Sequence, residues 1–430
     1  MRWAPGEGRW LRAAFCGVSL AAGLQAAETA LGSAGPSQFL AVWTGDEDRR
    51  HPDFLAILDV TPREPRYGTV VATRPVGFAA LDPHHTEHAL DPGQILFANG
   101  FAGDRSFRFD LRQPQRPRLL GSLATGAGFH YIHSFARAPG GRILATYQAE
   151  GPDREGAGGI AEFSQNGRFV RKSSARVDGI EPGLLRPYSM AVVPLLDRIV
   201  VGCSAMLFPP TWDEPHAVAM RSQMEHEHRG IHVQVYRLSD LKLLETVVLP
   251  DEANDGRITG AKEPRLLADG RTVLMSTGQG GLFKIDHLDS RLSVSRVFTF
   301  DGERCACGVP IVVGRFWVQP MANAHSLVSL DVTDAAHPRE VSRVRLGDRL
   351  LPHWLSWDPG GKRIVVADSC AVGGEHRLWI VAFDPETGHL DVDRRFGNPG
   401  STSPGFSFDL PSWPHGATGP GVPHGSVFIP

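Results

Sequence analysis

The sequence predicts an all-β fold, a seven-bladed β-propeller closed by strands from the two ends of the chain. Three observations lead to this fold class. Glycine (48) and proline (33) are abundant among the 430 residues and spread along the chain, which favours many turns. Beyond residue 38 the apolar segments are short, rich in β-branched and aromatic residues, and bounded by turn residues. These segments recur as a degenerate four-stranded repeat, the unit that a propeller arranges radially.

Six copies of the repeat follow one another along the chain. They begin at "HTEHALDPGQILFANG", "IHSFARAPGGRILATYQ", "YSMAVVPLLDRIVVGCSA", "EPRLLADGRTVLMSTG", "VPIVVGRFWVQPM" and "HWLSWDPGGKRIVVADSC". Near the N-terminus, "FLAVWTG" and "DFLAILDV" supply most of a seventh blade, and we expect the C-terminal "HGSVFIP" to complete it by pairing with them. Two stacked β-sandwiches are the main alternative architecture.

The chain begins with a segment that predicts a secretory signal peptide at 1–27, before a single propeller domain at 38–430. Arginines at positions 2, 9 and 12 precede an apolar core from Ala13 to Leu24, and the small residues Ala26 and Ala27 follow. This core is too short to span a bilayer. We therefore expect a periplasmic or secreted protein without membrane integration, the alternative being a disordered cytoplasmic tail.

Composition and motifs exclude several classes of function. The formal net charge is −3, and the basic clusters are short and lack interleaved aromatic residues, so we expect no nucleic-acid partner. The chain carries no G-x-S-x-G, no H-E-x-x-H and no glycine-rich phosphate loop between strand and helix. Nothing in the sequence indicates an oligomeric state.

Histidines recur at one position of the repeat. His85 and His133 each lie ten residues before the first residue of a second strand, and His353 lies eleven before one across a longer turn. Glu263 holds the ten-residue position in another copy. Since the first strand of each blade lines the central channel, we expect these side chains to meet near the axis.

Imidazoles that converge from separate rigid strands suit a borderline transition metal. Nitrogen ligation with few thiolates points to copper, zinc or iron rather than calcium or magnesium. The alternative is that the histidines hold ordered water or an anionic ligand. Two other segments carry possible ligands. In "MEHEHRGIH" at 224–232, a solvated loop is favoured over a second metal site. The cysteines of "CAC" at 305–307 are either an inert pair or a pair that exchanges disulfides or admits copper.

Several stretches also resemble a known family. "DFLAILDVTPREPRYGTVV", "PHHTEH", "FRFDLRQPQRPRLLGSL", "IHSFARAPGGRILATY" and "AHSLVSLDVTDAAHPREVSRV" are similar, in order, to the selenium-binding protein family, which includes bacterial methanethiol oxidases. The resemblance runs from about residue 39 to the C-terminus, and the double histidine is its most specific motif. It implies a copper-dependent oxidase, often periplasmic, that converts methanethiol, oxygen and water to formaldehyde, hydrogen sulfide and hydrogen peroxide.

The resemblance also implies a set of site residues. The metal ligands would be His84, His85, His133 and His415; His325 would be an additional channel residue, beside His353, which only its repeat position places there; and Glu263 would be catalytic. Two features depart from the family. The cysteine linked to selenium is missing from "FLAVWTGDED", and the cysteine-containing loop after the double histidine is absent, so we expect a divergent member.

Taken with the recurring histidines, the resemblance thus implies a copper-dependent oxidase whose partners are a small thiol and O₂. Glu263 would act as a general base or orient a ligand histidine, and the second role is favoured. Two other functions stay open. One is a non-catalytic periplasmic propeller that binds partners at its rims, and the other is a lactonase-like hydrolase, which would need a divalent ion held by carboxylate and Asn ligands.

Overall fold

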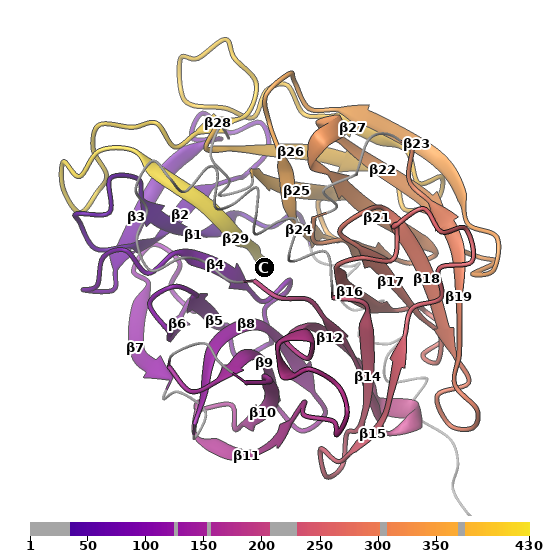
Figure 1. The fold of residues 1–430 in the computed structure, drawn as a ribbon. Helices are drawn as coiled ribbons and strands as arrows, with labels where there is room; N and C mark the ends of the chain where they lie inside the picture. The colour runs from indigo at the N-terminus through magenta and orange to yellow at the C-terminus, as the bar shows by residue number, and fades with distance from the viewer. Residues whose placement is uncertain (1–34, 124–127, 153–155, 207–229, 302–307, 369–374) are drawn as a thin grey trace, which may run out of the picture.

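The computed structural model describes residues 35–430 apart from 124–127, 153–155, 207–229, 302–307 and 369–374. The predicted signal peptide, the "CAC" motif and most of "MEHEHRGIH" lie outside the described residues. The described strands form seven sheets around a central axis, and Figure 1 looks down this axis. The prediction of a seven-bladed propeller is confirmed.

Each blade has four antiparallel strands, ordered from the innermost outward. Blade 1 has β29 (Gly421–Ile429), β1 (Phe39–Asp46), β2 (Phe54–Asp59) and β3 (Thr69–Pro75); blade 2 has β4 (Pro83–Thr86), β5 (Ile95–Gly100), β6 (Arg105–Asp110) and β7 (Arg118–Leu123). Blade 3 has β8 (Phe129–Ala138), β9 (Arg142–Glu150), β10 (Gly159–Phe163) and β11 (Phe169–Ser174); blade 4 has β12 (Pro187–Val193), β13 (Arg198–Cys203), β14 (His232–Arg237) and β15 (Leu243–Val248).

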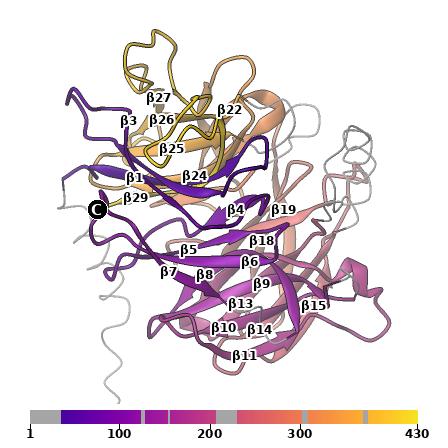
Figure 2. The same ribbon diagram turned by 90° about the vertical axis from the view of Figure 1, so that its left-hand side faces the viewer.

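The remaining blades follow the same plan. Blade 5 has β16 (Ala261–Leu266), β17 (Val273–Thr277), β18 (Gly281–Asp286) and β19 (Ser293–Thr299); blade 6 has β20 (Ile311–Val313), β21 (Phe316–Met321), β22 (Ser326–Asp331) and β23 (Arg339–Arg345). Blade 7 has β24 (Pro352–Asp358), β25 (Arg363–Asp368), β26 (Arg377–Phe383) and β27 (Leu390–Val392), and β28 (Phe406–Ser407) also pairs with β26. Figure 2 shows the ring from the side.

Position within the blade explains the hydrophobic pattern of the strands. The third strand β2 reads FLAILD and is buried throughout, because neighbouring blades cover both of its faces. The outermost strand β7 instead alternates between more and less exposed residues. Helical structure in the described residues is limited to three 3₁₀ turns, Pro182–Leu184, Pro194–Leu196 and Ala322–Ala324, and none of these could span a membrane.

The C-terminal strand closes the ring, as predicted. β29 pairs antiparallel with β1, with Leu40 opposite Phe428 and Ala41 opposite Val427. Alternate side chains of β29 point to opposite faces of blade 1. Val427 packs in the cluster shared with blade 2, while Phe428 packs in the cluster shared with blade 7. The last strand therefore joins blade 1 to both of its neighbours, and Figure 1 shows it near the centre of the ring.

Because β29 closes the ring, we expect a small loss of packing in it to lower the stability of the whole fold. Val427 is fully buried. The Val427→Ala variant should lower the free energy of unfolding by about 2 kcal/mol, since it removes about two buried methylene equivalents and leaves a small cavity. Urea unfolding measures this change. Val422→Ala, in the same strand but partly exposed, is the matched control; an equal loss in both variants would contradict the closing role of Val427.

Candidate metal centre

Five histidines meet at the axis of the propeller. His84 and His85 come from β4, His133 from β8, His353 from β24 and His424 from β29, which are all innermost strands. Their rings lie against one another: His84 stacks on His85 and on His424, with ring centroids 4.2 and 4.3 Å apart. The His353 ring lies 4.8 Å from that of His424. We call these five residues the channel histidines.

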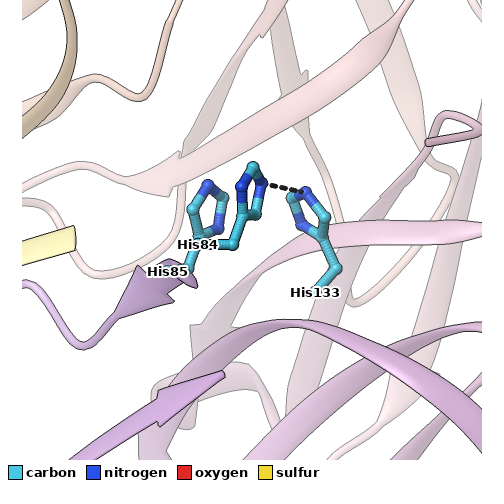
Figure 3. Close-up of side chains that lie close together, drawn as sticks. All are labelled: His84, His85 and His133. Carbon is cyan, nitrogen blue, oxygen red and sulfur yellow. Dashed lines mark hydrogen bonds between the residues drawn. The ribbon is translucent and has the colours of Figure 1, made fainter. Parts of the chain in front are cut away.

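The channel histidines bring their ring nitrogens close enough together to share a metal ion. His84, His85 and His133 each offer a nitrogen within 4.8 Å of the others, and so do His85, His353 and His424. The Nε2 atoms of His84 and His133 lie 3.2 Å apart (Figure 3). Two imidazoles that bind one ion tetrahedrally at about 2.0 Å would hold their nitrogens about 3.3 Å apart. The observed spacing therefore fits two ligands of one transition metal.

Hydrogen bonds to backbone carbonyls decide which nitrogen of two rings carries the proton. A carbonyl oxygen only accepts, so His133 Nδ1 donates to the Tyr188 carbonyl (2.7 Å) and His424 Nδ1 donates to the His84 carbonyl (2.5 Å). A neutral imidazole has a single N–H, which leaves Nε2 of both rings with a free lone pair. This is the arrangement of metal-binding histidines, whose other nitrogen usually donates to a carbonyl or carboxylate.

Burial keeps the channel histidines neutral. It is the main cause that lowers the pKa of His84, His85 and His353 well below the usual value, and the neighbouring imidazoles add to the effect. Burial also lowers the pKa of His133 to about 3 and that of His424 to about 4, although their bonds to carbonyls oppose it. At neutral pH the site therefore presents unprotonated nitrogens, the form that binds a metal.

Several of these nitrogens have no protein partner. Nε2 of His85, His353 and His424 is buried and has no hydrogen-bond partner among the described residues, and the same holds for Nδ1 of His84. A buried polar atom without a partner costs roughly 1–3 kcal/mol, so a group of them in one place calls for a ligand. One ion held by the group His85, His353 and His424 would satisfy the Nε2 atoms of these three rings together.

β-Bulges place the channel histidines. Six of the seven innermost strands have an irregular register, and the extra residues there are His84 and His85, His133 and Ser134, Tyr188, Lys262, His353, and His424 and Gly425. A bulge bends its strand locally and redirects the side chains at that point. The same device is repeated around the ring, so that residues which would otherwise alternate between the blade faces lie at the axis.

Polar side chains of the second strands hold the bulged backbone. Asn99 of β5 accepts a hydrogen bond from the His85 amide at 2.6 Å and donates to the carbonyls of Ile132 and His133. Thr146 of β9 accepts from the Ser134 amide and donates to the Tyr188 carbonyl. These bonds satisfy backbone groups that the bulges remove from the sheet ladder, and they link blades 2, 3 and 4 around the site.

Ser134 lies between two of the channel histidines. Its hydroxyl oxygen is 3.0 Å from Nδ1 of His85 and 3.0 Å from Nδ1 of His133, so it fixes the orientation of both rings. We expect Ser134→Ala to lower metal affinity about 10- to 100-fold, the usual effect of removing a group that orients a ligand histidine. A competition titration with a copper chelator measures this. Ser189→Ala, another buried serine of the channel, is the control, and equal affinities in both variants would contradict the role of Ser134.

A thioether completes one side of the cluster. Met206 Sδ lies 3.1 Å from Nε2 of His133, the atom that also faces His84. Imidazole and thioether together are ligands that suit copper, above all the cuprous ion, better than calcium or magnesium. The described residues that meet at the axis therefore fit a copper ion by donor type, by protonation state and by spacing.

The structure brings together some of the residues that the sequence predicted and separates others. His84, His85, His133 and His353 meet at the axis. His415 does not: its ring lies 4.7 Å from that of Phe54 and its Nδ1 bonds the Thr73 hydroxyl, so it sits on the outer strands β2 and β3. The prediction that His415 lies beside His85 and His133 is therefore wrong. His424 occupies the place at the axis instead.

His325 is also away from the channel. It ends the 3₁₀ turn between the second and third strands of blade 6, has a left-handed backbone conformation, and its Nδ1 donates to the Leu350 carbonyl at 2.6 Å. The expectation that it lines the channel is thus wrong, because the turn holds it at the rim of the blade. The histidine serves there as a turn residue and a hydrogen-bond donor.

Glu263 lies on the innermost strand β16, as its repeat position predicted. Its side chain is 2% exposed, and Oε2 lies 2.9 Å from Nη2 of Arg265. No hydrogen bond joins Glu263 to a channel histidine among the described residues, so the contacts do not favour the interpretation that it orients a metal ligand. Its assignment as a catalytic residue stays a prediction.

A cavity of about 300 Å³ lies on the other side of His85 along the channel. Phe135, Met190, Val309 and Trp354 give it an apolar wall, and its polar side chains include His85, Glu263 and Arg265. His88 closes part of it: its ring stacks on Trp354, and Nε2 accepts a hydrogen bond from Arg265 at 3.0 Å. His85 is thus the channel histidine that also borders a space for a small molecule.

The sequence interpretation missed His424 and Met206. The signal for His424 was available, because the strand that closes blade 1 is also its innermost strand and so lines the channel. Counting residues back from the second strand could not locate His424, because the second strand of blade 1, β1, lies near the N-terminal end of the chain and His424 near the C-terminal end. No pattern marks Met206, which reaches the site from the end of β13 through tertiary packing.

Comparison with known proteins supports the fold. No family model matches the chain, and no curated protein matches it in sequence. Among solved structures, a hypothetical selenium-binding protein from Sulfolobus tokodaii is 15% identical with a TM-score of 0.73, and the alignment covers 93% of this chain and 95% of that one. The periplasmic gluconolactonase of Pseudomonas aeruginosa is 16% identical with a TM-score of 0.60 and coverage of 91% and 99%. A putative 6-phosphogluconolactonase from Bacteroides fragilis has 13% identity, a TM-score of 0.57 and coverage of 93% and 99%. At these identities the likeness shows the propeller fold alone.

Proposed function

We propose that this protein is a copper-dependent oxidase of small thiols. The reaction class is that of a methanethiol oxidase, in which thiol, O₂ and water give an aldehyde, hydrogen sulfide and hydrogen peroxide. The observation that carries the proposal is the convergence of five neutral imidazoles, four of them buried and that of His353 half-buried, several with a ring nitrogen that has no protein partner among the described residues. The likeness to a structure described as a selenium-binding protein is consistent with it.

The donor set favours this reaction over a lactonase-like hydrolysis. Solved lactonase-like propellers share the fold, but a hydrolase that uses a hard divalent ion needs oxygen ligands. The two groups of candidate ligands at the axis contain only histidine. Glu263, the carboxylate that the sequence predicted in the channel, pairs with Arg265 instead. Nitrogen and thioether donors support a soft, redox-active ion and a sulfur substrate.

Copper bound to the channel histidines would supply a site for a thiolate sulfur and a redox couple for O₂. Residues of the chain would orient the ligand rings and enclose the substrate. Tyr188 and His84 carbonyls fix the tautomers of His133 and His424, and Ser134 fixes the rings of His85 and His133. The apolar wall of the cavity next to His85 excludes water from the alkyl part of a thiol. Export of the chain to the periplasm, predicted from residues 1–27, belongs to the same proposal.

Oxygen consumption tests the proposal. Purified protein is loaded with cuprous ion, freed of excess metal and mixed with methanethiol or ethanethiol in an oxygen electrode. We expect thiol-dependent uptake of O₂ with equal amounts of aldehyde, sulfide and peroxide. Metal-free protein and zinc-loaded protein are the controls. A copper-loaded protein that consumes no O₂ with any thiol would contradict the oxidase and favour a propeller that only binds partners.

A further inference from the structure

The cavity beside His85 is larger than methanethiol requires. Its volume of about 300 Å³ equals the share of about ten water molecules in the liquid, at about 30 Å³ each. Methanethiol has two non-hydrogen atoms and would leave most of this space to water. The cavity therefore has room for a thiol with a longer chain and a second functional group.

The charged groups of the cavity limit what that second group can be. Every nitrogen of Arg265 has a partner: Nε donates to the Pro310 carbonyl, Nη1 to the Pro264 carbonyl, and Nη2 contacts His88 and Glu263. Arg137 is bound in the same way by Glu87, Asp91 and the Ile95 carbonyl. Both cavity arginines are thus held by the protein, and neither is placed to receive an anionic substrate.

Glu263 is only partly held, because Arg265 contacts its Oε2 alone. It lines the cavity, its side chain is 2% exposed, and its Oε1 has no hydrogen-bond donor among the described residues. A buried carboxylate oxygen without a donor is costly, and a charged hydrogen-bond donor is its best partner. Glu87, the other cavity carboxylate, differs because Arg137 contacts both of its oxygens.

From this juxtaposition we propose that the protein acts on small thiols that carry a protonated amine, with the sulfur toward His85 and the ammonium group on Glu263. This substrate class rests on the proposed oxidase function. The overall step is R–CH₂–SH + O₂ + H₂O → R–CHO + H₂S + H₂O₂. The C–S bond breaks, a C=O bond forms with oxygen from water, the sulfur leaves as H₂S, and O₂ takes up the two electrons and two protons as H₂O₂.

Two thiols of equal size test the proposal in the copper-loaded protein. Cysteamine and 1-propanethiol each have four non-hydrogen atoms, but only cysteamine has an ammonium group. We expect kcat/KM for cysteamine to exceed that for 1-propanethiol, and Glu263→Gln to reduce the ratio of the two roughly 10- to 100-fold. Mercaptoacetate, an anionic thiol, should be the poorest of the three. A wild-type ratio near one, or an unchanged ratio in Glu263→Gln, would overturn the proposal.

Glu87→Gln is the matched control, since it changes the cavity carboxylate that Arg137 already occupies, and it should keep the preference for cysteamine. A second experiment separates this inference from the oxidase itself. Calorimetry with n-propylammonium and metal-free protein needs neither copper nor O₂. Binding that is lost in Glu263→Gln supports the ammonium site even if no oxidase activity is found, whereas equal binding to both proteins or no binding to either overturns it.

Discussion

The His133→Ala variant is expected to lose both bound copper and thiol oxidation. His133 Nε2 lies between His84 Nε2 and Met206 Sδ, at 3.2 and 3.1 Å, and its other nitrogen is fixed by the Tyr188 carbonyl. Removal of a group that only orients a ligand costs about 10- to 100-fold in metal affinity, so loss of the ligand itself should cost at least about 100-fold. Copper content after dialysis and O₂ uptake with a thiol measure the two effects.

Unfolding of the variant must be distinguished from loss of the site. Metal-free wild type and metal-free His133→Ala should both be folded and should unfold at similar denaturant concentrations. The missing ring leaves a space that water can enter at the channel. His325→Ala, a histidine at the rim of blade 6, should keep copper and activity. A His133→Ala protein that retains full copper after dialysis would contradict a metal centre that includes this residue.

The second large effect is expected for His424→Ala, with His415→Ala as its matched control. Both residues lie in the C-terminal segment, but only His424 is fully buried at the axis, where its ring stacks 4.3 Å from His84. His424→Ala should lower copper affinity about 100-fold and oxidase activity with it, since Nε2 of His424 has no other partner among the described residues. His415→Ala should leave copper affinity within about twofold, because Phe54 and Thr73 hold its ring on the outer strands.

Copper titration of the two variants in parallel measures this difference. The spectrum of the cupric protein adds a second readout, because loss of a nitrogen ligand changes it while a distant substitution does not. If His415→Ala lost copper and His424→Ala kept it, the ligand set implied by the family resemblance would be right and the one given by the geometry would be wrong.

The fold could be predicted from the sequence because each blade repeats the same local pattern. Short apolar strands and turn residues recur in six copies, and the pairing of β29 with β1 follows from the need to complete the seventh. The same repeat located His85, His133, Glu263 and His353 on innermost strands, since spacing to the second strand fixes the position of a residue along the first.

The full set of side chains that meet at the axis could not be obtained in this way. Which innermost residues turn toward the axis depends on the β-bulges, and a bulge leaves no clear mark in a single sequence. His415 and His424 are only nine positions apart in a segment rich in glycine and proline, so sequence similarity alone selected the one that lies away from the axis. Met206 reaches His133 across blades 3 and 4, a contact that only the tertiary structure shows.

Elemental analysis tests the central claim most directly. Wild-type protein and the His85→Ala, His133→Ala double variant are purified in the same way, incubated with copper, dialysed, and measured for copper, zinc and iron per chain. We predict near-stoichiometric copper in the wild type and none in the double variant. A wild type that holds no metal after this treatment, or a double variant that holds as much copper as the wild type, would contradict a copper centre built from the channel histidines.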